Sequence, residues 1–278
     1  MLSSQHLPPG FSALQPYLPW QLPILQKLDR PLFALTTRLT ILFCEWFPSQ
    51  ARALLRALAI SQLPENIDHD THFKPQYSPW QQRLCLTPDG DFFKALHKPH
   101  TNIVTGTIQR VTKDSILMKD GAEIKVDAIV TATGLTMRST GGHIKIAVDG
   151  QEVKAGGRFI WNGCMLEGIP NLTMVVGYSN SAWTIGADAA TGILLRLLKH
   201  MRKNDIAVAT PKIPGKGFTK TYPLFELSST YIAAAEAESR LPIYGNEGPW
   251  KPKRSALADH VHATWGDVTT GLVFSPSK

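Results

Sequence analysis

A predicted strand that leads into an amphipathic helix is the feature of this sequence that most constrains its fold. Residues 171–178 form an apolar run typical of a buried strand, and residues 179–181 provide a short polar turn after it. Beyond the turn, apolar residues recur at helical spacing and share one face: Ile185, Ala189, Leu194, Leu197, Leu198 and Met201. Ser181 or Thr184 can cap the start of this helix. The combination indicates a chain that mixes strands with helices.

Further strands and hairpins are predicted ahead of that helix. The β-rich segments are 102–108, 115–118, 124–130 and 144–148. Lys119-Asp120-Gly121 and Asp149-Gly150 are hairpin signals. The apolar run 128–130 has no polar interruption, which is typical of a strand covered on both faces. Together with the helices, these strands predict the α/β class, with α+β as the alternative.

Residues 1–64 have a helical pattern, although a Pro-rich stretch of extended chain or loop is expected over the first 25 residues. One stripe comprises Leu28, Leu32, Leu35, Leu39, Leu42 and Trp46. Pro48 closes this segment, and Leu54, Leu55 and Leu58 share a face in the next one. The stripe predicts a face that packs in a core. The alternative is a face that lies on a membrane surface, since Leu, Phe and Trp are mixed with Arg.

The remaining segments carry weaker signals. Residues 65–100 are polar and aromatic with few repeating patterns, and 204–224 is a Pro/Gly/Lys-rich loop. A short helix is expected at 230–239, followed by an irregular tail.

Composition narrows the class of protein. Hydrophobic residues make up 43% of the chain, which excludes wholesale disorder. The net charge of +7 comes from scattered Lys and Arg without a basic stripe, so no nucleic-acid partner is expected.

Three Cys without a C-x-x-C motif favour a reducing compartment, and no secretory signal is visible, so a cytoplasmic location is expected. Arg38 and Glu45 interrupt the apolar stretch 32–47, leaving peripheral membrane association as the alternative to a buried helix.

Several common fingerprints are absent from the sequence. It contains no G-x-G-x-x-G, P-loop or H-E-x-x-H motif, and Gly177-Tyr178-Ser179-Asn180-Ser181 misses the last position of G-x-S-x-G. Four residues imitate a metal cluster: Asp68, His69, Asp70 and His72. Such residues in a polar loop are usually solvated, so no metal site is expected.

Two places carry sharper signals for a binding site. Small residues follow the predicted strand at 131–134, where backbone can approach a ligand closely, and the helix that starts near Trp183 offers free N–H groups. The second place is the aromatic and Pro-rich segment 72–85, which surrounds Arg83. The alternative for that segment is a packed surface loop with Arg83 in a salt bridge.

Five motifs then occur in a recognisable order. They are H-F-x-P-x-Y-x-P-W-x-Q-R-L-C (72–85), P-D-G-D-F-F-K-A-L (88–96), D-A-I-V-T-A-T-G-L (127–135), P-N-L-T-M-V-V-G-Y-S-N-S-A-W-T (170–184) and L-P-I-Y-G-N-E-G-P-W (241–250). The set resembles the C-terminal half of the class B flavin-dependent monooxygenases, the flavin-containing and Baeyer–Villiger group. The resemblance covers residues 65–250 well and 1–64 loosely.

The resemblance implies an enzyme that binds FAD, is reduced by NADPH, and uses a peroxyflavin to oxygenate a small organic substrate such as a ketone, amine or thioether. Arg83 matches the arginine that stabilises the anionic peroxyflavin and positions the nicotinamide. Thr133 and Gly134 match the crossing between the NADPH and FAD domains. Tyr178, Trp183 and Thr184 match the region that faces the flavin, with core packing as the alternative for Trp183.

The family's Gly-rich pyrophosphate motifs for FAD and NADPH are missing from this sequence. The resemblance therefore implies a truncated two-dinucleotide-binding flavoprotein fold. Its parts would be a helical segment (1–64), the C-terminal part of the NADPH domain (65–140), and the C-terminal part of the FAD domain with a tail (141–278).

Three hypotheses follow for function. The chain is inactive alone, or it acts with a partner chain or as a homo-oligomer that completes the FAD site. Alternatively, it is a non-catalytic small-molecule-binding or interaction protein derived from that family. A third possibility is a longer protein in which Met1 is internal.

Overall fold

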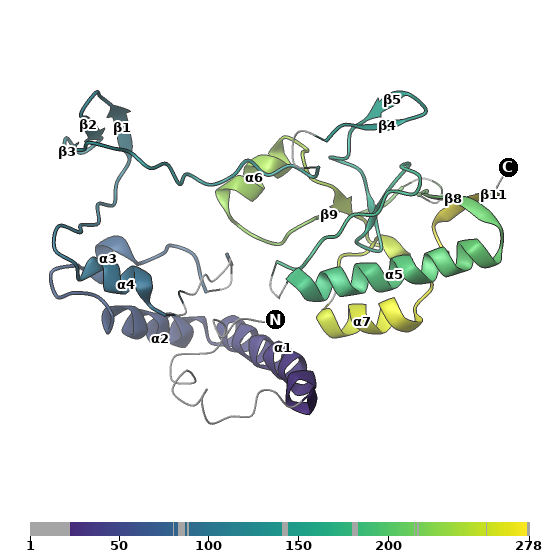
Figure 1. Cartoon of the computed structure of the whole chain (residues 1–278), viewed down its shortest axis with the longest axis horizontal. Helices are drawn as coiled ribbons and strands as arrows, with labels where there is room; N and C mark the ends of the chain where they lie inside the picture. Colours follow the sequence, from purple (N-terminus) through teal and green to yellow (C-terminus); the bar gives the residue numbers. More distant parts are fainter. Residues whose placement is uncertain are drawn as a thin grey trace. The chain divides into compact units, whose positions relative to one another are not determined.

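The computed structural model describes residues 23–79, 81–82, 87, 89–140, 144–179, 183–213, 215, 217–253 and 255–276, excepting the side chains of 23–31, 33 and 34. The chain divides into two compact units (Figure 1). The N-terminal unit comprises Met1–Trp80 and Leu84–Gly134, and the C-terminal unit comprises Gln81–Arg83 and Leu135–Lys278. The fold is mixed α/β, and the strand pairs of its described sheets are all antiparallel.

The N-terminal unit contains the helices α1 (Pro23–Trp46), α2 (Pro48–Ile60), α3 (His69–His72) and α4 (Asp91–Leu96). Pro48 ends α1 and is itself the first residue of α2, a position where its missing N–H leaves no helical hydrogen bond unmade. Asp68 caps α3 by accepting a hydrogen bond from the Thr71 amide at 2.7 Å. The predicted helical pattern of the first 64 residues is therefore confirmed from Pro23 onward, whereas α3 and α4 were not foreseen.

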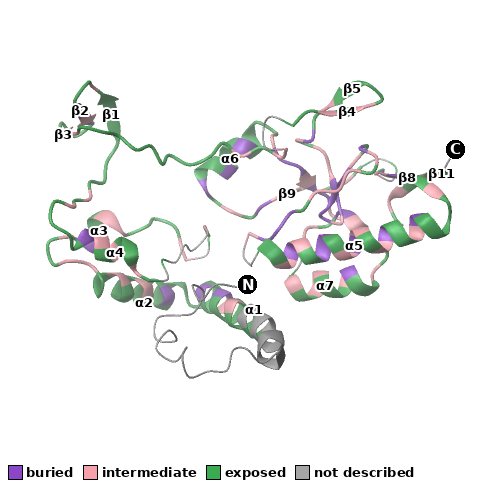
Figure 2. Ribbon diagram, viewed as in Figure 1, coloured by how far each residue is buried: buried purple, intermediate pink, exposed green. Residues whose placement is uncertain are grey.

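The outward stripe of α1 contradicts the prediction of a core face. Leu32, Leu35, Leu39 and Trp46 are all exposed, while Ile41 and Cys44 are buried. Figure 2 shows buried and exposed residues side by side along the described part of α1. Helical spacing identifies residues that share a face, but it does not say whether another element covers that face.

One three-stranded sheet lies in the N-terminal unit, in the order β1 (Ile108–Val111), β2 (Ser115–Met118) and β3 (Glu123–Lys125). The predicted hairpin at residues 119–121 is confirmed, and the Asp120 carboxylate there accepts a hydrogen bond from the Ala122 amide at 3.0 Å.

Two strand predictions in this unit are wrong in extent. Only Ile108 of 102–108 enters a strand, and the predicted strand 124–130 ends at Lys125. Val130 is 93% exposed instead of covered on both faces. A strand covered on both faces must lie within a sheet that has elements packed above and below it, and no described segment forms a sheet pairing with 127–134.

The described residues of the C-terminal unit form four two-stranded sheets. These are β4 (Ile146–Val148) with β5 (Gln151–Val153), β6 (Ile160–Trp161) with β7 (Met165–Leu166), β8 (Ile206–Pro211) with β11 (Leu272–Pro276), and β9 (Tyr222–Pro223) with β10 (Ile243–Tyr244). The predicted Asp149-Gly150 hairpin is confirmed, and both residues have the positive φ values (50° and 78°) of a primed turn.

The helices of this unit are α5 (Trp183–Lys203), α6 (Thr230–Ala237) and α7 (Ala256–Trp265), with a 3-10 turn, η3, at Gly248–Trp250. Helices α5 and α7 lie side by side (Figure 1), and Arg196 of α5 donates hydrogen bonds to the carbonyls of His262, Ala263 and Gly266 at the end of α7. The predicted helix after residue 181 and the short helix near 230 are confirmed. The buried face of α5 is shifted from the prediction, since Leu198 is 50% exposed.

Two apolar clusters form the core of the C-terminal unit. One joins α5 to Trp161, Trp250 and Ala263, and the other surrounds Ile160, Leu166 and Ile232.

Further predictions for the C-terminal unit are wrong because long-range pairing overrides local pattern. Residues 171–178 make only an isolated bridge at Thr173, the expected loop 204–224 contains β8 and β9, and the expected irregular tail contains α7 and β11.

Asn171 covers the edge of β8 that faces away from β11. Its side-chain amide donates to the Ala207 carbonyl at 3.0 Å and accepts from the Ala209 amide at 2.9 Å. Its own backbone N–H donates to the Ala209 carbonyl at 3.0 Å, and Gly168 N–H donates to the Pro211 carbonyl at 2.8 Å. Asn171 adopts a left-handed φ of 55°, a conformation that asparagine tolerates better than most residues.

Candidate functional site

Arg83, the predicted catalytic residue, lies outside the described residues. The part of its motif that precedes it is anchored within the N-terminal unit. His72 shares a 2.9 Å hydrogen bond with the Thr105 hydroxyl, and Arg52 of α2 donates to the Tyr77 carbonyl at 3.1 Å. The role of Arg83 therefore stays a prediction.

The small-residue turn at the end of the N-terminal unit is open to solvent. Thr133 and Gly134 are exposed, Gly134 has a φ of +89°, and, apart from its two chain neighbours, no described residue lies within 4 Å of the place where its Cβ would be. Close approach of a ligand to this backbone is sterically free. The two residues belong to the N-terminal unit, whereas Tyr178, Trp183 and Thr184 belong to the C-terminal unit.

The structure brings Tyr178 and Trp183 close to one another through two glycines. A Cβ on Gly177 would overlap the Trp183 indole, and a Cβ on Gly186 would lie 2.7 Å from the Gly177 Cα. Both glycines are therefore required for the start of α5 to approach the chain at 176–178 this closely. The Trp183 side chain remains 45% exposed, with its ring centroid 6.4 Å from that of Phe225.

Trp183 and Thr184 are both exposed at the start of α5, a helix of 21 residues. The N–H groups in the first turn of a long helix attract electron-rich atoms. This end of α5 can therefore receive the polar edge of an aromatic ring beside an exposed indole.

Tyr178 is buried, and its hydroxyl donates a 2.6 Å hydrogen bond to Asp259 of α7. Burial and this hydrogen bond raise the pKa of Tyr178. The half-buried ammonium of Lys253 lies 5.1 Å from the Tyr178 ring centroid and donates to the Val176 carbonyl. Burial lowers the pKa of Lys253, and the nearby Asp259 carboxylate opposes that shift.

Sequence reasoning did not single out Lys253 or Asp259 as site residues. The available signal was the small cationic cluster Lys251, Lys253 and Arg254. Val176 lies 77 residues before Lys253 in the sequence, and Tyr178 lies two residues nearer, so no local pattern connects Lys253 to either partner.

Two recesses occur in the described part of the C-terminal unit. One, of about 320 Å³, lies between Tyr222, Glu236 and Leu241, and the other, of about 310 Å³, is lined by Tyr222, Asn246, Lys251, Pro252 and Lys253. Both volumes are at the small end of the range of about 300–1,000 Å³ for ligand pockets. Among the predicted site residues that the structure describes, none lines either recess.

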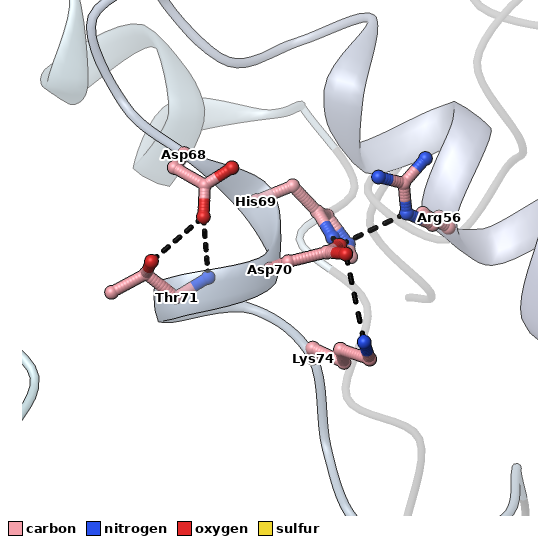
Figure 3. Close-up of polar contacts among 6 residues, drawn as sticks. All are labelled: Arg56, Asp68, His69, Asp70, Thr71 and Lys74. Carbon is pink, nitrogen blue, oxygen red and sulfur yellow. Dashed lines mark hydrogen bonds and ion pairs between the residues drawn. The ribbon is translucent and has the colours of Figure 1, made fainter.

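The carboxylates that imitate a metal cluster are engaged by neighbouring side chains (Figure 3). The Asp70 carboxylate lies 2.8 Å from His69 Nδ1, accepts from Arg56 Nε at 3.0 Å, and lies 3.6 Å from Lys74 Nζ. The hydrogen bond from His69, followed by that from Arg56, lowers the pKa of Asp70. Within the described ranges, no group of three or more His, Cys, Asp or Glu side chains is arranged to hold a metal ion.

The described residues fit a flavin in one respect only. The exposed start of α5 fits the edge of a flavin ring, but the G-x-G-x-x-G turn that would hold a pyrophosphate is absent from the sequence. In the two-dinucleotide-binding fold that the resemblance implies, such a turn holds the pyrophosphate.

Known proteins supply the decisive comparison. The chain is 37% identical over 216 residues to the FAD-containing monooxygenase EthA of Mycobacterium tuberculosis. It is 36% identical over 208 residues to the putative FAD-containing monooxygenase MymA of the same species, and 35% identical over 214 residues to the probable FAD-binding monooxygenase AlmA of an Acinetobacter species. The chain is similar to FAD-containing monooxygenases.

The similarity is extensive within this chain and partial within its relatives. The matches cover 78%, 75% and 77% of this chain, but 43%, 41% and 42% of EthA, MymA and AlmA. The chain therefore spans less than half the length of these relatives. No family model matches it. The comparison confirms the predicted resemblance at the level of flavin monooxygenases.

One structural finding bears on the membrane alternatives. Across the described residues, no helix combines the length and the apolar character that crossing a membrane requires.

Proposed function

We propose that this chain forms part of an FAD-dependent monooxygenase that is reduced by NADPH and oxygenates a small organic substrate, by Baeyer–Villiger or heteroatom oxygenation. The observation that carries the proposal is the 37% identity to an FAD-containing monooxygenase over 216 residues. The ordered motifs between residues 72 and 250 support it. When bound, FAD would supply the redox chemistry, in which NADPH provides a hydride, one oxygen atom of O₂ enters the substrate and the other leaves as water.

Five of the six predicted site residues have a task in this proposal. Trp183 and Thr184, at the start of α5, face the flavin ring, and the helix N–H groups there stabilise its electron-rich edge. Arg83 supplies a permanent positive charge where negative charge develops. Thr133 and Gly134 provide the open backbone at the crossing between the two nucleotide-binding regions.

The Gly-rich pyrophosphate turns come from residues outside this sequence in this proposal, either in a longer protein or in a partner chain. Turnover is therefore expected only when those residues are present. The chain by itself is expected to retain little flavin, because much of the affinity for a dinucleotide comes from the Gly-rich turn.

The test compares this chain alone with the same chain mixed with, or fused to, the region of EthA that the match does not cover. Each sample is incubated with FAD, freed of excess flavin and examined for visible flavin absorbance and NADPH oxidation. Absorbance and substrate-dependent NADPH oxidation in the completed protein support the proposal. Absence of retained flavin from every combination contradicts it.

Arg83→Ala separates the catalytic role from cofactor binding. In the completed protein we expect a fall of about 10²- to 10³-fold in substrate oxygenation with flavin retention preserved, because the lost charge acts on the reacting atoms. Arg38→Ala, an exposed position on α1, is the matched control and should leave turnover unchanged. Equal turnover in Arg83→Ala and wild type would remove Arg83 as a catalytic residue.

A further inference from the structure

Two residues near the C-terminal end of the chain hold the backbone just ahead of α5. Lys253 donates a hydrogen bond to the Val176 carbonyl, and its ammonium lies 5.1 Å from the Tyr178 ring centroid. Asp259, in the first turn of α7, accepts a 2.6 Å hydrogen bond from the Tyr178 hydroxyl. The segment 176–178 is thus hydrogen-bonded at both of its ends, through the Val176 carbonyl and the Tyr178 hydroxyl.

The space beside Gly163 accommodates the Lys253 side chain, but its ammonium is partly withdrawn from water. A Cβ on Gly163 would lie 2.5 Å from Lys253 Cε and 3.3 Å from the Tyr244 hydroxyl, so the lysine stem passes where a side chain would otherwise stand. Withdrawing an ammonium from water is unfavourable unless other groups compensate it. The Val176 carbonyl, the Tyr178 ring and the Asp259 charge provide that compensation. A methionine would fill the same space without this penalty, which indicates that the charge serves a specific contact.

The segment 176–178 packs directly against the start of α5. Gly177, between the two hydrogen-bonded residues, packs beneath the Trp183 indole and against Gly186. Displacement of 176–178 would therefore displace Trp183. Helix α7 provides a fixed frame for Asp259, because Arg196 of α5 is hydrogen-bonded to three carbonyls near the end of α7.

We propose that Lys253 and Asp259 are positioning residues, which lock the chain at 176–178 against α7 and thereby hold Trp183 and Thr184 in place at the start of α5. That these two residues face a flavin rests on the proposed function. The positioning itself rests on contacts within this chain and is testable without any cofactor.

The first experiment measures amide hydrogen exchange by mass spectrometry in this chain without flavin. In Lys253→Met, peptides covering 187–192, whose amides bond back to the first turns of α5, should exchange at least about tenfold faster, because a hydrogen bond from a charged group that holds the start of this helix is lost. The β4–β5 hairpin is the internal reference and should be unchanged. Lys251→Met removes the same charge from an exposed position and should behave like wild type.

Asp259→Asn and Tyr178→Phe provide milder tests if Lys253→Met fails to fold. Each variant weakens or removes the hydrogen bond between Tyr178 and Asp259 and should accelerate exchange at the same peptides by a smaller factor. Unchanged exchange at these peptides in all variants overturns the proposal. Equal acceleration at the β4–β5 hairpin also overturns it, because the residues would then act on general stability.

The second readout is the visible spectrum of FAD bound to the completed protein. Lys253→Met should shift the flavin absorbance band and weaken FAD retention, whereas Lys251→Met should do neither. If wild-type protein binds no FAD while the exchange results hold, the proposed function fails and the positioning role stands. If exchange accelerates but bound FAD is unaffected, the link between positioning and the cofactor is overturned.

Discussion

The two units of this chain use similar apolar helices with opposite results. In the C-terminal unit, the apolar face of α5 is covered by α7, β8 and Trp161, and it belongs to a continuous core cluster. In the N-terminal unit, the leucine stripe of α1 is exposed among the described residues, and both core clusters lie elsewhere. The difference shows that an apolar stripe determines which side of a helix seeks a partner, while the partner determines whether the stripe contributes to stability.

Truncation of one leucine in each unit should give the largest contrast. Leu197→Ala, at a residue that is 2% exposed on α5, should lower the free energy of unfolding by about 2–5 kcal/mol, because a cavity replaces the side chain. Leu39→Ala, at a residue that is 56% exposed on α1, should change it by less than about 0.5 kcal/mol. Urea unfolding monitored by Trp fluorescence and circular dichroism measures both.

The neighbouring Leu198→Ala serves as the same-helix control and should resemble Leu39→Ala. A large loss in Leu39→Ala would contradict the contrast. It would show that the stripe on α1 is covered in solution.

Glycine substitutions on α5 should give an intermediate effect. Gly186→Ala places a methyl group 2.7 Å from backbone and should destabilise the C-terminal unit by about 1–3 kcal/mol. In Gly192→Ala the new methyl group would lie 3.4 Å from the Ala263 Cβ, an ordinary contact. That variant should gain up to about 1 kcal/mol, because alanine loses less backbone entropy in a helix. Thermal melting of the pair checks the prediction, and equal melting temperatures would refute the close approach at Gly177.

The smallest expected effect is a local response to acid in the N-terminal unit. The folded pKa of Asp70 lies below its unfolded value, so its ionised form stabilises the fold above about pH 4, and this contribution is lost as the pH falls toward the folded pKa. Asp70→Asn should accelerate hydrogen exchange over 69–74 at pH 7, with a difference from wild type that shrinks under acid conditions. Asp91→Asn, at an exposed position of α4, is the control. A difference that persists in acid would remove Asp70 ionisation as its cause.

Local sequence pattern predicted the elements whose backbone hydrogen bonds are local. The Asp149-Gly150 hairpin and α5 are confirmed because turn chemistry and helical spacing act over a few residues. The pairing of β8 with β11 joins Ala209 to Phe274, and no short-range signal predicts it. Val130 shows the converse, since its apolar run predicts a buried strand that has no described partner.

The candidate site likewise contains residues that the sequence pointed to and residues that only the structure identified. Ordered motifs pointed to Trp183, Thr184 and Gly134, and the resemblance behind them is confirmed at the level of flavin monooxygenases. The roles of those residues, and that of Arg83, stay predictions. Lys253 and Asp259 were missed because their contacts to Val176 and Tyr178 arise only once the C-terminal segment folds back along α5.

The Asn171 amide has a consequence for how this protein behaves in crowded solution. Strand β8 has β11 along one edge, and the turn at 168–171 occupies the other with backbone and side-chain hydrogen bonds. An unprotected strand edge invites another molecule to add a strand, which begins aggregation. Asn171, in its left-handed turn, therefore protects the edge of β8 from self-association. A substitution at this position would cause precipitation as well as a loss of stability.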